Sequence, residues 1–128
     1  MSDTKIGELS LVVLPVSDQD RSIAFYESLG FEKRADTPFG GSYRWVEVYP
    51  PSGTAGIALP VPPEGQEVAP RETGVTLTSL DIDATHEQFT ALGVDVDAEV
   101  SRMGDPVPPM FWFRDPDGYS LLVVQQAA

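Results

Sequence analysis

The sequence contains no cysteine, a single histidine and few basic side chains. The absence of cysteine excludes disulfide scaffolds, thiolate zinc sites, iron–sulfur clusters and cysteine nucleophiles. Only 8 basic residues stand against 20 acidic ones in the 128-residue chain, which gives a formal net charge of −12. Because no basic stripe is available to neutralise phosphate groups, we expect no nucleic-acid partner.

Long apolar runs are also absent. Nowhere do roughly 18 apolar residues follow one another, and the first ten residues lack the apolar segment of a signal peptide. We therefore expect no membrane partner and a cytoplasmic location. What the chain does have is a hydrophobic content of 41% with 9% aromatic residues, which is enough to form the core of one globular domain over residues 1–128.

The second half of the chain repeats the pattern of the first at an offset of 63 residues. The aligned pairs include Val12 with Val75, Asp18 with Asp81, Tyr26 with Phe89, and Gly30 with Gly93. These pairs cover a strand, a helix start, a helix face and a helix stop, so the repeat indicates an internal duplication.

Each copy has the pattern of one strand, one helix and three further strands. In the first copy the helix follows the cap residue Asp18 and stops at Gly30, and strands are predicted at 9–15, 31–35, 43–49 and 56–59. In the second copy the cap is Asp81 or Asp83, the helix stops at Gly93, and strands are predicted at 75–80, 94–100, 110–113 and 119–124.

The predicted fold class is therefore α+β, with two tandem βαβββ modules at about 6–61 and 72–126 and a proline-rich linker at about 62–71. One helix covers only one face of a four-stranded sheet. Two sheets that face one another solve this problem, and they enclose a curved paired-sheet cavity with the helices outside.

Three segments carry a resemblance to a known family. VSDQDRSIAFYESLGF at 16–31 resembles the first strand-to-helix signature of the vicinal oxygen chelate (VOC) superfamily, of the glyoxalase/bleomycin resistance protein/dioxygenase type. LDIDATHEQFTALGV at 80–94 is similar to its second helix, and FRDPDGYSLLVV at 113–124 to its closing hairpin. The resemblance covers residues 7–126 and implies the same paired βαβββ fold.

In the enzymatic members, the resemblance implies a divalent metal held by four side chains that project from the sheets into the cavity. The corresponding positions here are Leu11 on the first strand, Ile57 or Ala58 on the fourth, Gly74 or Val75 on the fifth, and Leu122 on the last. None of these residues carries a metal-binding side chain, so we predict that the chain holds no metal and no cofactor.

Two polar features have structural explanations. His86 lies on the flank of the second predicted helix, outside the cavity, and is not counted as a metal ligand or a base. Asp115 and Asp117 resemble a carboxylate pair, but both belong to the tight turn Asp-Pro-Asp-Gly, where aspartates bond to the backbone.

Aromatic residues are the main candidates for lining the cavity. The aliphatic side chains of Val46 and Val48 suit packing under a helix, which assigns Tyr43, Trp45 and Glu47 to the cavity face of their strand. If the two faces were swapped, Trp45 would belong to the core instead. The predicted ligand-binding set is Tyr43, Trp45, Glu47, Met103, Met110 and Trp112, where Met103 belongs to a Pro- and Gly-rich loop at 102–109 that overhangs the opening.

Glu47 is the weak candidate for a catalytic residue. A carboxylate between aromatic side chains is costly to bury without a partner, and burial would raise its pKa toward that of a general base. Further hydrogen-bonding groups in the cavity are predicted at Ser42, Thr76, Thr78 and Ser120.

These features favour a metal-independent protein that binds a small molecule, sequestering an aromatic or apolar metabolite or antibiotic. The alternative is a VOC enzyme, either a lyase or isomerase of the glyoxalase I type or a dioxygenase, that depends on a metal or on a carboxylate base. A regulatory or structural role is the third possibility. We also expect a homodimer, with the cavity formed either within one chain or across two.

Overall fold

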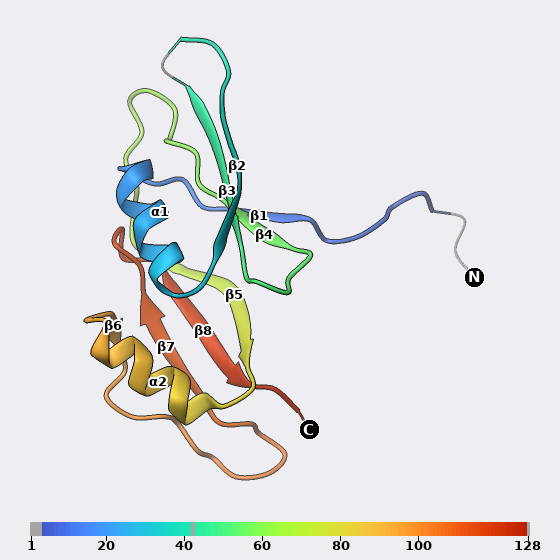
Figure 1. Cartoon of the computed structure of the whole chain (residues 1–128), viewed down its shortest axis with the longest axis vertical. Helices are drawn as coiled ribbons and strands as arrows, with labels where there is room; N and C mark the ends of the chain where they lie inside the picture. Colours follow the sequence, from blue (N-terminus) through green and yellow to red (C-terminus); the bar gives the residue numbers. More distant parts are fainter. Residues whose placement is uncertain (1–3, 42, 128) are drawn as a thin grey trace.

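The computed structural model describes residues 4–41 and 43–127, and it contains two four-stranded sheets (Figure 1). The order in the first sheet is β1 (Leu11–Val13), β4 (Gly56–Ala58), β3 (Arg44–Tyr49), β2 (Glu32–Pro38). The order in the second is β5 (Glu72–Ser79), β8 (Ser120–Gln125), β7 (Met110–Arg114), β6 (Asp95–Val96). Each half of the chain forms one sheet, and in both the first strand pairs in parallel with the last. The predicted fold class of two βαβββ modules is confirmed.

The two helices, α1 (Gln19–Ser28) and α2 (Ile82–Ala91), begin and end in the same way. The carboxylate of Asp18 accepts a hydrogen bond from the amide of Arg21, and Asp81, rather than Asp83, accepts one from the amide of Ala84. Each helix is followed by a glycine with positive φ, +101° at Gly30 and +78° at Gly93, a conformation that other residues rarely adopt.

Strand limits differ more from the sequence prediction. The strand expected at 94–100 forms only over Asp95–Val96, followed by an isolated bridge between Ser101 and Met110. The amide of Asp97 donates to the carbonyl of Trp112, and Ser101 bridges to Met110, so the three residues 98–100 lie opposite the single residue Phe111 and regular pairing is interrupted. The first strand is also shorter than 9–15, whereas β5 begins three residues earlier than expected.

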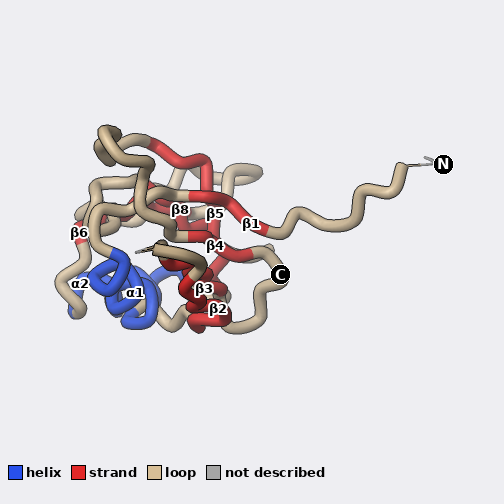
Figure 2. The backbone as a smooth tube through the Cα atoms, turned by 90° about the horizontal axis from the view of Figure 1, so that it is seen from above, coloured by secondary structure: helices blue, strands red, loops and turns tan. Residues whose placement is uncertain are grey.

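One core joins both halves of the chain. Val46 and Val48 of β3 and Phe111 and Phe113 of β7 are buried in the same cluster as residues of both helices. The ring of Phe113 lies 6.3 Å from the ring of Phe25 in α1 and 5.1 Å from that of Phe89 in α2. Both helices therefore pack against the same side of the sheets, as Figure 2 shows.

Polar contacts also connect the two halves. The buried hydroxyl of Tyr26 donates to Asp115 Oδ2 over 2.9 Å, and the hydroxyl of Tyr119 donates to the carbonyl of Pro15 over 2.7 Å. Nearby, Asp117 accepts from the hydroxyl of Ser17 and forms an ion pair with Arg21. The tight turn between β7 and β8 is thus fixed to the start of α1 in the other half.

Residues 4–10, which precede β1, extend away from the body of the molecule (Figures 1 and 2). Among them, the apolar residues Ile6 and Leu9 are 83% and 74% exposed. Neither of the helices in the described parts of the chain is long and apolar enough to cross a bilayer.

Candidate functional site: the open sheet faces and the cavity between the modules

The face of the first sheet that is turned away from the helices carries Trp45, Glu47 and Tyr49. Alternation along β3 places these three side chains together, because Val46 and Val48 are completely buried on the helix side. All three are half-buried. The alternation along the strand therefore places Trp45 and Glu47 on the face opposite Val46 and Val48.

Glu47 connects the two aromatic side chains. Its Oε2 accepts a hydrogen bond from the indole Nε1 of Trp45 over 2.6 Å, and its Oε1 accepts one from the hydroxyl of Tyr49 over 2.7 Å. The bond to Glu47 raises the pKa of the Tyr49 hydroxyl, with a smaller contribution from desolvation. The three residues form a unit, called here the Trp45–Glu47–Tyr49 group, in which a carboxylate orients two rings.

Gly56 of β4 makes room for this group. A Cβ atom added at Gly56 would lie 2.7 Å from the ring of Tyr49, closer than two carbon atoms can approach. The Tyr49 ring therefore lies directly over the backbone of β4. The hydroxyl of Tyr49 reaches Glu47 from this position because position 56 has no side chain.

The corresponding face of the second sheet carries Met110 and Trp112. Both are half-buried, while Phe111 and Phe113 between and beyond them are buried on the helix side. Trp112 pairs across the sheet with Leu122. Next to Trp112, the carboxylate of Asp97 accepts from Arg114 over 2.8 Å, so the charges on this face are paired.

The remaining predicted residues differ in exposure. Tyr43 is 51% exposed and stacks on Phe39, and Met103 is 72% exposed in the loop before β7. Thr76 and Thr78 are exposed on β5, and Ser120 is half-buried at the start of β8. Ser42 lies outside the described residues.

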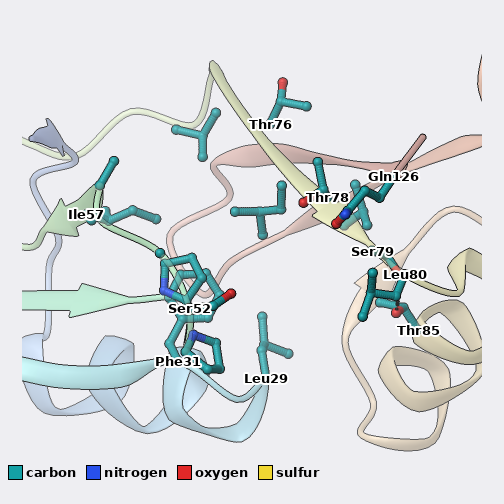
Figure 3. A pocket seen from close by; sticks show the side chains of 18 of the residues that line it. Leu29, Phe31, Ser52, Ile57, Thr76, Thr78, Ser79, Leu80, Thr85 and Gln126 are labelled. Atoms are coloured by element: carbon teal, nitrogen blue, oxygen red, sulfur yellow. Dashed lines mark hydrogen bonds between the residues drawn. The ribbon is translucent and has the colours of Figure 1, made fainter. Parts of the chain in front are cut away.

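A cavity with a volume of about 1140 Å³ lies between the two modules. Figure 3 shows its opposite walls, with Leu29, Phe31 and Ile57 from the first half and Thr78, Leu80 and Gln126 from the second. Of the predicted ligand-binding and hydrogen-bonding residues that the structure describes, Thr76 and Thr78 line it and neither tryptophan does. The positions compared with metal ligands contribute Ile57, Gly74 and Val75 to its wall. A second pocket of about 260 Å³ is lined by Tyr43, Trp45 and residues of the linker, including Pro60 and Pro63.

The sequence predicted a cavity between the two modules, but most of the residues that line the larger cavity were not singled out. Several of its lining residues, such as Val12 and Val75, occupy aligned positions in the two halves and have the character of ordinary core residues. Their exposure depends on how the two modules pack against each other, and no pattern within one module carries that information.

The comparisons with a family model and with solved structures point to one family. The sequence profile of the glyoxalase/bleomycin resistance protein/dioxygenase superfamily matches residues 8–123. The chain belongs to this superfamily. No curated protein matches the chain with significance.

Solved structures of superfamily members resemble the chain over nearly its whole length. A member from Sphaerobacter thermophilus DSM 20745 is 30% identical, with a TM-score of 0.86 over 96% of this chain and 100% of that one. TnmS3, an antibiotic binding protein from Streptomyces sp. CB03234, is 30% identical, with a TM-score of 0.81 over 97% and 99% of the two chains. A glyoxalase/bleomycin resistance protein from the same organism is 30% identical, with a TM-score of 0.75 over 92% and 100%.

The positions at which enzymatic members of the superfamily hold a metal do not fit a metal here. On β4 the pairing of Ala58 with Glu47 places Ala58 on the open face, whereas Ile57 belongs to the core. Leu11 and Leu122 are half-buried leucines, and Gly74 has a φ of +75° in an irregular part of β5. Within residues 4–41 and 43–127, no three His, Cys, Asp or Glu side chains are grouped so that they could hold a metal ion.

His86 and Asp115 take structural positions. The imidazole Nε2 of His86 lies 2.7 Å from the carbonyl of Asp97, and its ring packs edge-on against Phe111. Asp115 Oδ1 accepts from the amides of Asp117 and Tyr119, as expected for a residue that closes a tight turn. The bond from Tyr26 to Asp115, by contrast, was not evident in the sequence.

Proposed function

We propose that the protein is a metal-independent binder of a small molecule, and that it sequesters an aromatic or apolar metabolite or antibiotic. The observation that carries this proposal is the Trp45–Glu47–Tyr49 group, two oriented aromatic rings on an open sheet face where the superfamily's metal donors are replaced by apolar residues. Rings held in place by hydrogen bonds lose little conformational entropy when a flat ligand stacks on them.

The superfamily context supports the same proposal. TnmS3, with which the chain shares 30% identity and almost its full length, is described as an antibiotic binding protein. Binding without reaction requires only a complementary surface, and the half-buried Met110 and Trp112 on the second sheet provide a similar surface.

The two tryptophans offer a direct test, because one lies on each open face and neither lines the larger cavity. Trp45→Phe and Trp112→Phe leave one fluorophore on each sheet. We expect a neutral tricyclic aromatic such as acridone to quench the tryptophan fluorescence of both single-tryptophan proteins. It should bind Trp45→Phe more weakly than Trp112→Phe, because Trp45→Phe removes the indole that donates to Glu47. The affinity is expected to be unchanged after dialysis against EDTA and after addition of nickel, zinc, manganese or iron(II).

Other outcomes would contradict specific parts of the proposal. An affinity that requires one of the metals would favour the enzymatic alternative. If calorimetry detects binding but neither tryptophan is quenched, the ligand binds in the cavity between the modules and not on the open sheet faces. The absence of any binding by acridone and a panel of similar aromatic molecules would argue against the binding function itself.

The proposal includes a homodimer. The edges of β1 and β5 have no strand beside them within the described chain, and Val13 and Leu80 at these strands are 48% and 82% exposed. We expect light scattering after gel filtration to give twice the mass of one chain for the parent protein. The double variant Val13→Lys, Leu80→Lys should have the mass of a single chain. A monomeric parent protein at micromolar concentration would contradict this expectation.

A further inference from the structure

The carboxylate of Glu47 has no cationic partner. Both of its oxygens accept hydrogen bonds from neutral donors, the indole of Trp45 and the hydroxyl of Tyr49. Glu47 takes part in none of the ion pairs among the described residues. The other half-buried carboxylate next to a tryptophan, Asp97, is by contrast bound to Arg114. The open face of the first sheet therefore carries a negative charge that no side chain compensates.

Apolar side chains surround this charge. Along the row of residues that crosses the sheet at Glu47, the neighbours are Ala58 and then Val13 on one side and Ala35 on the other. These neighbours carry no polar group in their side chains, and Glu47 itself is half-buried between the two rings. Because apolar groups and rings displace water around it, a charge here is screened less than a charge at an ordinary surface position.

Arg34, the cation close to this group, is already occupied. Its guanidinium carbon lies 4.6 Å from the centre of the Tyr49 ring. The guanidinium forms an ion pair with Glu32 and donates to the backbone carbonyls of Pro50, Pro51 and Gly53. The pair of Arg34 and Glu32 has no net charge, so the charge of Glu47 remains.

We propose that the ligand of this site is an aromatic cation, held by Trp45 and Tyr49 through its ring and by Glu47 through its positive charge. The inference rests on the proposed binding function and adds the class of ligand. A cation gains from the faces of tryptophan and tyrosine as well as from the carboxylate, whereas an anion is repelled. The net charge of −12 attracts cations from a distance in the same sense.

Three probes that share one tricyclic ring system separate charge from stacking: the 9-aminoacridinium cation, neutral acridone and the acridine-9-carboxylate anion. We expect calorimetry at low salt to show that the parent protein binds the cation most tightly, the neutral molecule less tightly and the anion most weakly. The dissociation constants of the cation and the neutral molecule should differ at least about tenfold. The advantage of the cation should shrink as salt is raised.

Glu47→Gln tests the role of the carboxylate, and Glu87→Gln is the matched control because it removes the same charge at an exposed position on α2. Glu47→Gln is expected to lower the cation's affinity about tenfold and that of acridone less than twofold, while Glu87→Gln changes neither. An equal loss for cation and acridone would mean that Glu47 only positions the rings, and it would overturn the inference.

The failure of this inference is distinguishable from the failure of the proposed function. Tight binding of acridone without any preference for the cation overturns the ligand class and leaves the binding function in place. If none of the three probes binds the folded parent protein, both are overturned. Circular dichroism of Glu47→Gln shows whether the variant is folded, and the acridone affinity shows whether its aromatic wall is intact.

Discussion

At the scale of single residues, the most consequential contact outside the candidate site is the bond between Tyr26 and Asp115. Both side chains are buried, with exposures of 0% and 5%. Burial raises the pKa of the Asp115 carboxyl, while the hydrogen bond from Tyr26 opposes that rise. Burial and the neighbouring Asp115 also raise the pKa of Tyr26 well above its usual value, so its hydroxyl remains a donor at physiological pH.

Tyr26→Phe removes one of the donors to a buried carboxylate. We expect the free energy of unfolding at pH 7 to fall by about 1–3 kcal/mol. The bond favours the ionised carboxyl, so its loss raises the folded-state pKa of Asp115 further. As pH falls, Asp115 is therefore protonated at a higher pH in the folded variant than in the folded parent protein. The difference in free energy of unfolding between the two proteins should become smaller from neutral pH toward the ordinary pKa of aspartate. Urea denaturation at pH 7, 5.5 and 4 measures both effects.

Tyr43→Phe is the matched control for this prediction, because it removes the same hydroxyl from a residue that is 51% exposed. The change should lie within about 0.5 kcal/mol at every pH. A deficit of Tyr26→Phe that grows toward acid pH would show that the hydroxyl binds the protonated carboxyl more strongly, contrary to this account.

At the scale of elements, the helices were predictable because their signals are local. Asp18 and Gly30 lie at the two ends of α1, and Asp81 and Gly93 do the same for α2. Cap and stop residues form their contacts within one helical turn, so their effect does not depend on how the rest of the chain packs and can be predicted from the sequence.

The strands were predictable in number and order but less so in extent. Whether a strand continues depends on its neighbour. β6 ends at Val96, opposite Phe113, and beyond Asp97 the regular pairing with β7 is interrupted until the bridge between Ser101 and Met110. The same distinction applies to the candidate site. Alternation along β3 was sufficient to place Trp45 and Glu47 on one face, whereas the position of the Tyr49 ring over Gly56 depends on a strand that follows in sequence and pairs in space.

At the scale of the whole molecule, the duplication and the packing have opposite implications for whether the two modules unfold separately or together. Two copies of one βαβββ module, joined by a linker, are the pattern of units that fold separately. The structure instead has one hydrophobic cluster that draws residues from both halves, and Phe113 contacts both helices. The buried bond of Tyr26 to Asp115 and the bond of Tyr119 to Pro15 add polar contacts to the same junction.

We therefore expect the two modules to unfold together, in one cooperative transition. Trp112→Phe leaves Trp45 as the reporter of the first sheet, and Trp45→Phe leaves Trp112 as the reporter of the second. Because each single-tryptophan protein has its own stability, fluorescence is compared with far-ultraviolet circular dichroism of the same protein in urea. The two curves should coincide for each protein, since loss of either module exposes the shared core of the other. A fluorescence transition that precedes or follows the loss of secondary structure would show that the halves retain the independence that their duplication suggests.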